Sequence, residues 1–224
     1  MSVPWQFLEF ALQSGALAFG DFTTKSGRKT PYFFNAGRFE RGSTLAKLAR
    51  FYAQTLLAAR ADGRVRFDML FGPAYKGITL ASATAVALAE QGLDLPFSYN
   101  RKERKDHGEG GELVGAPLRG RVMIVDDVIT DGAAKREALD LIRGHGAEPA
   151  GVVIMLDRME RTGADGALSA VSAVRAFEQE TRVPIISIAD LDDLVGLLRS
   201  GTPLAASAQP YLSSIEAYRK RYGA

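Results

Sequence analysis

Residues 121–146 read RVMIVDDVITDGAAKREALDLIRGHG, and this stretch decides the fold that we expect. It begins with a short, uninterrupted apolar run at 121–125, which is typical of a strand covered on both faces. A polar loop follows, and then a helical pattern over 133–145 that ends at Gly146. The stretch therefore predicts one strand–loop–helix unit of a parallel sheet.

The same alternation continues on both sides of this stretch. We expect further strands at 68–71, 95–99, 151–156 and 183–188, and helices at 75–91, 168–179, 190–198 and 212–222. Residues 101–118 are polar and rich in glycine without periodicity, which predicts a mobile loop. Together these patterns predict an α/β fold: a doubly wound, mostly parallel sheet flanked by helices.

The N-terminal part does not follow this alternation. Its pattern predicts a helix at 4–13, strands at 17–24 and 32–38, and a long helix at 43–60. The polar link KSGRKTP at 25–31 indicates that the two strands form a hairpin. We expect one domain over 1–224, in which about residues 1–40 form a small hairpin hood over a site in the sheet.

Composition limits the possible functions. The 224 residues are 46% hydrophobic and 24% charged, as in ordinary globular proteins, and they include no cysteine. Disulfides, thiolate metal sites and a cysteine nucleophile are therefore excluded. The N-terminal sequence does not have the pattern of a signal peptide, no stretch is apolar for the length of a membrane span, and the net charge of +2 gives no argument for nucleic acid. We expect a cytoplasmic protein.

The loop that follows the 121–125 run carries the clearest chemical pattern. Asp126 and Asp127 are strong acceptors for a pair of vicinal hydroxyls. Thr130 can donate a hydrogen bond, Gly132 lets the backbone approach a phosphate, and the helix that starts near Ala133 offers unpaired N–H groups. A capping aspartate in a turn would explain one of these acids, but two beside a buried strand are costly without a partner. The pattern predicts a site for ribose 5-phosphate.

Two other segments follow predicted strands and suit anions. FGPAYKG at 71–77 nearly matches a P-loop, but Ile78 stands where the P-loop lysine is required, which excludes that type of nucleotide hydrolysis. RKERKDHGEGG at 101–111 has four cations in its first five residues. Such a run is usually a solvated loop, yet cations followed by glycines also suit a lid that closes on a polyanion.

Residues 122–134 strongly resemble the phosphoribosyl pyrophosphate motif of type I phosphoribosyltransferases. The wider resemblance is to the orotate phosphoribosyltransferase family, and it covers nearly the whole chain. It is carried by Lys25-Ser26-Gly27, YFFN at 32–35, FGPAYKG, the loop 101–111 and Leu156-Asp157-Arg158. The motif alone marks the superfamily, whereas this combination is specific to the orotate enzymes.

The resemblance implies Mg²⁺-dependent transfer of ribose 5-phosphate from phosphoribosyl pyrophosphate to orotate, without a protein ligand to the metal. It assigns catalysis to Lys105, Asp126 and Asp127, and orotate binding to Phe33, Phe34, Thr130 and Arg158. It assigns the donor to Lys25, Tyr75, Lys76, Arg101, Lys102, Lys105, His107, Asp126, Asp127, Val128, Ile129, Thr130, Asp131, Gly132, Ala133 and Ala134. It also implies a homodimer that shares the lid loop across subunits, with no nucleic acid or membrane partner.

Two residues depart from the family pattern. Asp131 and Ala133 stand in a segment that commonly reads Ala-Gly-Thr-Ala, so one hydroxyl is lost and one carboxylate is added near the expected phosphate. We therefore expect a working site with weaker donor affinity. The alternatives are a ligand-sensing regulator, against which the catalytic-type loop argues, and a transferase for a purine base, against which YFFN and Arg158 argue.

Overall fold

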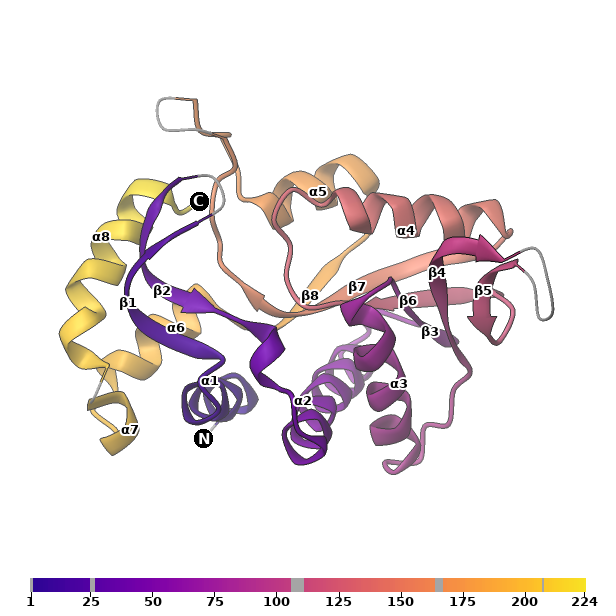
Figure 1. The fold of residues 1–224 in the computed structure, drawn as a ribbon, viewed down its shortest axis with the longest axis horizontal. Coiled ribbons are helices and arrows are strands. Elements are labelled where there is room, and N and C mark those ends of the chain that lie inside the picture. Colours follow the sequence, from indigo (N-terminus) through magenta and orange to yellow (C-terminus); the bar gives the residue numbers. More distant parts are fainter. Residues whose placement is uncertain (1, 25–26, 106–110, 164–166, 207) are drawn as a thin grey trace.

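The computed structural model describes residues 2–24, 27–105, 111–163, 167–206 and 208–224. Its main sheet has six strands in the order β5-β4-β3-β6-β7-β8 (Figure 1). The strands are β3 (Met69–Gly72), β4 (Phe97–Lys105), β5 (Gly111–Gly115), β6 (Arg121–Val125), β7 (Glu148–Asp157) and β8 (Ile185–Asp190). β5 pairs antiparallel with β4 and the other neighbours pair parallel, which confirms the expected fold class.

Helices cover both faces of the sheet (Figure 1). On one face lie α2 (Gly42–Ala61) and α3 (Lys76–Ala89), and on the other lie α4 (Ala133–Gly144) and α5 (Ala173–Thr181). Successive residues of a strand point to opposite faces, so Met123 and Val125 enter the first core whereas Val122 and Ile124 enter the second. This double burial is the reason that the strands read as continuous apolar runs.

The chain reverses its winding between β3 and β6. From β3 the chain passes through α3 to β4 on one side, and from β6 it passes through α4 to β7 on the other. In parallel sheets, ligands bind outside the carboxyl ends of the strands at such a switch point. The loop after β3 and the loop after β6 are the two segments for which the sequence predicts anion sites, so the topology brings them to one edge.

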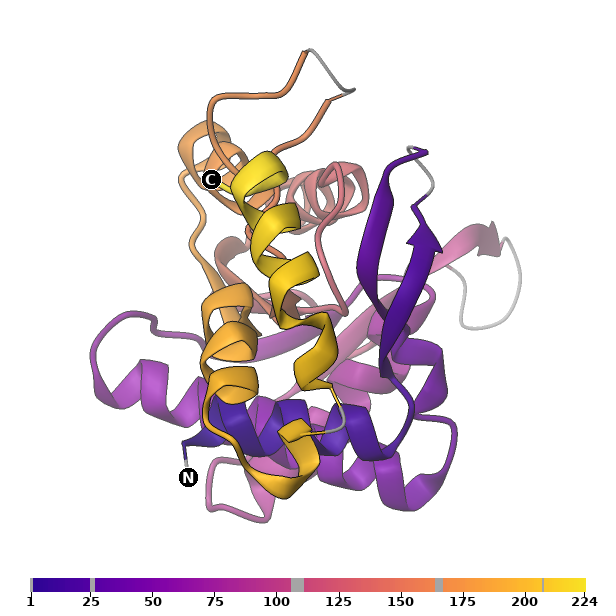
Figure 2. The same cartoon turned by 90° about the vertical axis from the view of Figure 1, so that its left-hand side faces the viewer.

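The N-terminal residues form a separate two-stranded arm beside the sheet (Figure 2). α1 (Val3–Gln13) precedes the antiparallel strands β1 (Leu17–Thr23) and β2 (Lys29–Phe34), which confirms the hairpin. The second strand lies earlier than the predicted 32–38, because the Asn35 side chain accepts a hydrogen bond from the Gly37 N–H and residues 36–38 turn into the 3-10 helix η1 (Ala36–Arg38).

The C-terminal helices pack beside this arm. α6 (Leu191–Arg199), α7 (Pro203–Ala206), η2 (Gln209–Tyr211) and α8 (Leu212–Tyr222) follow β8. α8 runs alongside the arm, and its Tyr218 ring meets the Tyr32 ring of β2 edge-on, with 6.0 Å between the ring centroids. The C-terminal segment also crosses the loop after β7, where the Arg161 N–H donates to the Tyr222 carbonyl at 2.8 Å. This two-stranded arm, which is the predicted hood, and the C-terminal segment therefore stabilise each other.

The prediction of a loop at 101–118 was wrong for most of the residues that the structure describes there. β4 continues to Lys105 and pairs with β5, and the Arg101 guanidinium donates to the Gly111 carbonyl at 3.2 Å. Residues 101–103 of β4 and all of β5 are half-buried or exposed at the end of the sheet, so they need no apolar run. Residues 106–110 lie outside the described part of the chain.

One helix also begins later than expected. The pattern over 168–179 predicts a helix from Leu168, whereas α5 starts at Ala173 because the Ser172 hydroxyl accepts a hydrogen bond from the Arg175 N–H and caps the helix there. Within the described ranges, no helix is both long enough and apolar enough to cross a membrane.

Candidate active site

Two aspartates follow β6 directly, at the switch point of the sheet. Asp126 and Asp127 are 7% and 9% exposed. The Asp126 N–H donates to the Val153 carbonyl at 3.0 Å, and the Met155 N–H donates to the Asp127 carbonyl at 2.8 Å. These bonds extend the pairing with β7, so the backbone of both acids is as fixed as the strand itself.

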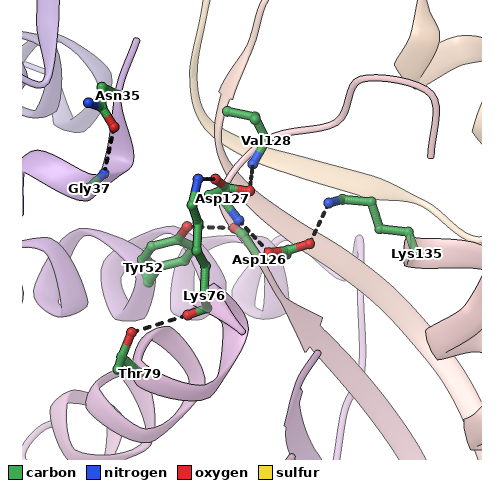
Figure 3. Close-up of polar contacts among 9 residues, drawn as sticks. All are labelled: Asn35, Gly37, Tyr52, Lys76, Thr79, Asp126, Asp127, Val128 and Lys135. Carbon is green, nitrogen blue, oxygen red and sulfur yellow. Dashed lines mark hydrogen bonds and ion pairs between the residues drawn. The ribbon is translucent and has the colours of Figure 1, made fainter. Parts of the chain in front are cut away.

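The Asp126 carboxylate has a partner on each oxygen (Figure 3). Oδ1 accepts a hydrogen bond from the Asp127 N–H at 2.9 Å, and Oδ2 lies 2.5 Å from the Lys135 ammonium. The Tyr52 hydroxyl of α2 donates to the Asp126 carbonyl at 2.7 Å. Burial raises the pKa of Asp126 above its usual range, and the Lys135 cation opposes this rise.

The Asp127 carboxylate is fixed in the same manner by different groups. Oδ1 accepts from the Val128 N–H at 2.8 Å, and Oδ2 lies 2.5 Å from the Lys76 ammonium. The two lysines reach the acid pair from opposite sides, Lys76 from α3 and Lys135 from α4 (Figure 3). The Lys76 side chain is 60% exposed, whereas that of Lys135 is 5% exposed.

The loop between β3 and α3 packs unusually closely on the start of its own helix. A Cβ atom on Gly72 would lie 2.0 Å from the Gly77 carbonyl oxygen, and one on Gly77 would lie 2.5 Å from Pro73 Cδ. The Ala74 N–H donates to the Asn100 side chain of β4 at 2.8 Å. This packing places Lys76 beside Asp127 and leaves the Tyr75 side chain at the surface, where Tyr75 is 73% exposed.

The loop between β6 and α4 presents an open helix N-terminus. Gly132 precedes α4 with φ +78°, and a Cβ atom there would lie 3.1 Å from the Phe177 ring, so glycine suits both the turn and the space. Thr130, Asp131, Ala133 and Ala134 are exposed around it. Val128 is half-buried and Ile129 is buried, so these two side chains support the loop from the protein interior.

Asp131 uses one of the donors of this helix start. Its Oδ1 accepts a hydrogen bond from the Ala133 N–H at 3.1 Å. The Arg136 guanidinium donates to the Asp131 carbonyl at 2.7 Å and forms a two-pronged pair with Glu180. The added carboxylate therefore turns toward the backbone donors, where the resemblance places the 5-phosphate.

Arg158 follows β7 and lies on the side of the hood. Its guanidinium lies 5.1 Å from the centroid of the Tyr32 ring, and its Nη2 lies 2.7 Å from Glu160 Oε1. The Tyr32 hydroxyl also donates to Glu160 Oε1, at 3.1 Å. Burial raises the pKa of Tyr32 far above its usual range, so this hydroxyl remains a donor. Tyr32 and Glu160 thus hold the Arg158 guanidinium against the second strand of the hood.

The two hood phenylalanines differ in their surroundings. Phe33 is 41% exposed and has the Phe22 ring as its neighbour, with 5.5 Å between the ring centroids. Phe34 packs against Phe7 and Phe39 of the core, at 6.2 and 6.4 Å. The ring of Phe33 is therefore open to a ligand, and that of Phe34 is mainly structural.

The predicted lid residues are only partly described. Arg101 and Lys102 lie on β4. Lys105 ends this strand, but its side chain, together with Lys25 and His107, lies outside what the structure describes. In the described part of the chain, no group of three or more His, Cys, Asp or Glu side chains lies close enough together to hold a metal ion.

Sequence reasoning missed Lys135, Tyr52 and Glu160. Lys135 is the one with a readable signal, because it lies on the face of α4 that also carries Ala138, Leu139 and Ile142. A lysine at a core-facing position of a helix needs a counter-charge, and the loop that leads into this helix carries the acids Asp126, Asp127 and Asp131. Tyr52 is distant in sequence from Asp126, and Glu160 is distant from Tyr32, so neither contact gives such a signal.

Comparison with known proteins identifies the family. Residues 36–184 match the model of the phosphoribosyl transferase domain. The chain is 59% identical over 218 residues to the orotate phosphoribosyltransferase of Herminiimonas arsenicoxydans, covering 97% of this chain and 96% of the relative. The chain belongs to the orotate phosphoribosyltransferase family. Another member of this family, from Janthinobacterium sp. (strain Marseille), is 57% identical over 218 residues, covering 97% of this chain and 96% of the relative.

A solved structure supports the same assignment. The crystal structure of orotate phosphoribosyltransferase from Francisella tularensis matches with a TM-score of 0.82 and 37% identity, covering 98% of this chain and all of that one. The family expected from the motifs is thus confirmed over nearly the full chain, and the purine transferase and the regulator are not supported.

Proposed function

We propose that the chain transfers ribose 5-phosphate from phosphoribosyl pyrophosphate to orotate, giving orotidine 5′-phosphate and pyrophosphate. The observation that carries the proposal is the Asp126–Asp127 pair, held rigidly at the switch point beside the open start of α4. Adjacent acceptors and a helix N-terminus match the two ends of a ribose 5-phosphate.

Donor binding would divide between the two loops. Each carboxylate oxygen has a second lone pair, so Asp126 and Asp127 can accept from the ribose hydroxyls while keeping their present partners. The N–H groups of Gly132 and Ala134 and the Thr130 hydroxyl would bind the 5-phosphate, and the Ala133 N–H would join them if the phosphate displaces the Asp131 carboxylate. Tyr75, Lys76 and Arg101 would meet the pyrophosphate, together with the other cations of the lid: Lys25, Lys102, Lys105 and His107.

Orotate would bind between the hood and the end of β7. It is a flat anion with a carboxylate and two carbonyls, and the planar Arg158 guanidinium suits such groups. The exposed ring of Phe33 and the backbone near Phe34 would contact the base. Thr130, at the edge of the phosphate loop, would meet the base from the other side.

The reaction would need no protein nucleophile, because the orotate nitrogen attacks the sugar carbon directly, with inversion. The sugar develops positive charge while the pyrophosphate leaves with negative charge. The Asp126–Asp127 carboxylates would stabilise the first, and the cations of the lid would stabilise the second, with Lys105 assigned to the leaving group by the resemblance. Catalysis would rest on positioning and electrostatics.

The residues fit Mg²⁺ that is carried by the substrate. Such ions prefer substrate phosphates and water to a full set of protein ligands, and both aspartates already have protein partners on each oxygen. Held mainly by the substrate, the ion would supply positive charge against the leaving pyrophosphate. Asp126 and Asp127 would orient the ribose hydroxyls.

We also propose a cytoplasmic homodimer in which the β4–β5 hairpin reaches the partner's site. The support is the family resemblance and the position of this hairpin at one end of the sheet (Figure 1).

A direct assay tests the function. The protein is mixed with Mg²⁺, phosphoribosyl pyrophosphate and either orotate or a purine base, and the absorbance of the base is followed. We expect a change with orotate alone. Intact donor binding with no orotate-dependent change would refute the proposal.

A further inference from the structure

Resting on the proposed function, we propose that Lys135 is a positioning residue that fixes the Asp126 carboxylate, as an anion and in one orientation, toward the ribose hydroxyls. Lys135 would act entirely through Asp126, without touching the substrate. Asp126 and Asp127 would then both be held by a lysine, Asp126 from the protein interior and Asp127 from the surface.

The position of Lys135 in α4 is that of a core residue. It lies in the first turn, its N–H donates to the Gly132 carbonyl at 3.1 Å, and the whole residue is 4% exposed. The buried face of the helix continues with Ala138, Leu139 and Ile142. An apolar side chain would complete this face at lower cost, because taking an ammonium out of water costs several kcal/mol unless it is paired.

The only described acid within ion-pair distance of the Lys135 ammonium is Asp126, at 2.5 Å. Replacing a buried ion pair by apolar residues is often neutral or stabilising, so the pair is weak support for the fold. Its placement at the candidate active site indicates a role in orienting Asp126. In metal sites, mutating a residue that orients a functional side chain from behind typically lowers activity by about 10- to 100-fold, and we expect an effect of that order here.

The charges around Asp126 explain why a cation is needed. Asp127 adds a like charge from the same loop, α2 contributes only the Tyr52 hydroxyl, which binds the Asp126 carbonyl, and the Lys76 cation of α3 is engaged with Asp127. Burial and Asp127 both raise the pKa of Asp126, and Lys135 lowers it. Without Lys135, Asp126 would bind a proton at higher pH and lose part of its capacity to accept from ribose.

Lys76 provides the contrast that separates positioning from substrate contact. Its ammonium bonds to Asp127 at 2.5 Å, yet its side chain is 60% exposed and can also reach a bound pyrophosphate. Lys135 is enclosed by the helix and the sheet and has no comparable access. In a protein that already carries Asp126→Asn, replacing Lys135 by methionine should therefore cause no further loss of activity, whereas the same replacement of Lys76 should.

The test uses Lys135→Met, Asp126→Asn, both together, and Lys76→Met with Asp126→Asn as the matched control. We expect Lys135→Met to lower kcat/KM for phosphoribosyl pyrophosphate about 10- to 100-fold, with KM for orotate changed less than about twofold. We expect the acid limb of its pH profile to move to higher pH. The pair Asp126→Asn and Lys135→Met should be no worse than Asp126→Asn alone, whereas Lys76→Met should lower the activity of Asp126→Asn further.

The outcomes separate the possibilities. A folded Lys135→Met with wild-type kcat/KM and pH profile would overturn the role, as would losses that multiply in the Asp126→Asn and Lys135→Met protein. If Lys135→Met does not fold, the double variant decides, because it leaves no unpaired buried charge. Wild-type protein without activity on orotate would refute the proposed function instead, and the donor dissociation constants of the same variants would still test Lys135.

Discussion

The ion pairs Asp126–Lys135 and Asp127–Lys76 look alike in chemistry and differ in access to solvent. In each pair one carboxylate oxygen takes a backbone N–H and the other takes a lysine at 2.5 Å. The lysine side chains are 5% and 60% exposed. A closed pair can set geometry but cannot exchange partners, whereas an open pair can release its cation to an incoming anion. Adjacent residues of one loop thus combine a fixed acceptor with an adjustable one.

The largest expected effect comes from removing the carboxylate of the closed pair. Asp126→Ala leaves the Lys135 ammonium buried without a counter-charge, so the free energy of unfolding should fall by about 3–5 kcal/mol. Denaturant unfolding measures it. Asp127→Ala is the matched control, with an expected loss of about 1 kcal/mol, because Lys76 can turn to water. Equal losses in the two variants would break the distinction between the pairs.

A third lysine extends the comparison to the leaving group. If Lys105 has the proposed role at the leaving group, Lys105→Ala should lower kcat about 100-fold, because a charge that stabilises a developing anion acts mainly in the transition state. KM for orotate should change little, since the proposed base site involves Arg158 and Phe33 instead. Steady-state kinetics with each substrate varied in turn measure both values. Unchanged turnover would remove Lys105 from the catalytic step.

The open pair should affect donor binding more than stability. Lys76→Ala should raise the dissociation constant of phosphoribosyl pyrophosphate about 10-fold, in line with the loss of one charge-assisted contact of about 1.5 kcal/mol. The midpoint of thermal unfolding should hardly move, because exposed ion pairs stabilise little. Calorimetric titration and thermal unfolding of the same preparation check the two claims. A large loss of stability would show that this pair is structural as well.

The smallest expected effect concerns Asp131, a carboxylate without a lysine partner in the described contacts. Asp131→Asn should tighten donor binding a few-fold, since an exposed charge near an anion costs about 1 kcal/mol or less. The amide keeps an oxygen for the Ala133 N–H, so the turn is preserved. Calorimetry at low and high salt tests it, because screening should shrink the difference. An unchanged dissociation constant at low salt would exclude electrostatic interference.

The sequence predicted the sheet and the acid pair because both depend on local patterns. Buried parallel strands such as 121–125 require continuous apolar runs, and a strand end followed by Asp126, Asp127 and a glycine turn is recognisable in one short stretch. The same reasoning predicted the start of β4 but failed at its second half, residues 101–105, and at the edge strand β5, where the exposed pairing imposes no apolar pattern. It also placed β2 too late, because the turn at Asn35 depends on one side-chain hydrogen bond.

The partners of the site residues were harder to predict because they come from distant segments. Tyr52 and Asp126 are 74 residues apart, and Tyr32 and Glu160 are 128 residues apart. Only the packing of α2 and of the hood against the sheet brings them together. Lys135 is different, since its position on the buried face of α4 was readable and its need for a counter-charge follows from elementary electrostatics.

The hydrogen bond between Asp131 and the Ala133 N–H also bears on inhibitor selectivity. A compound that mimics the 5-phosphate must either displace this carboxylate from its donor or bind the remaining N–H groups beside it. A relative that reads Ala-Gly-Thr-Ala at these positions would lack this carboxylate and carry an extra hydroxyl. A neutral hydrogen-bond acceptor in place of the phosphate should therefore lose less affinity here than in those relatives, which gives a chemical handle for distinguishing them.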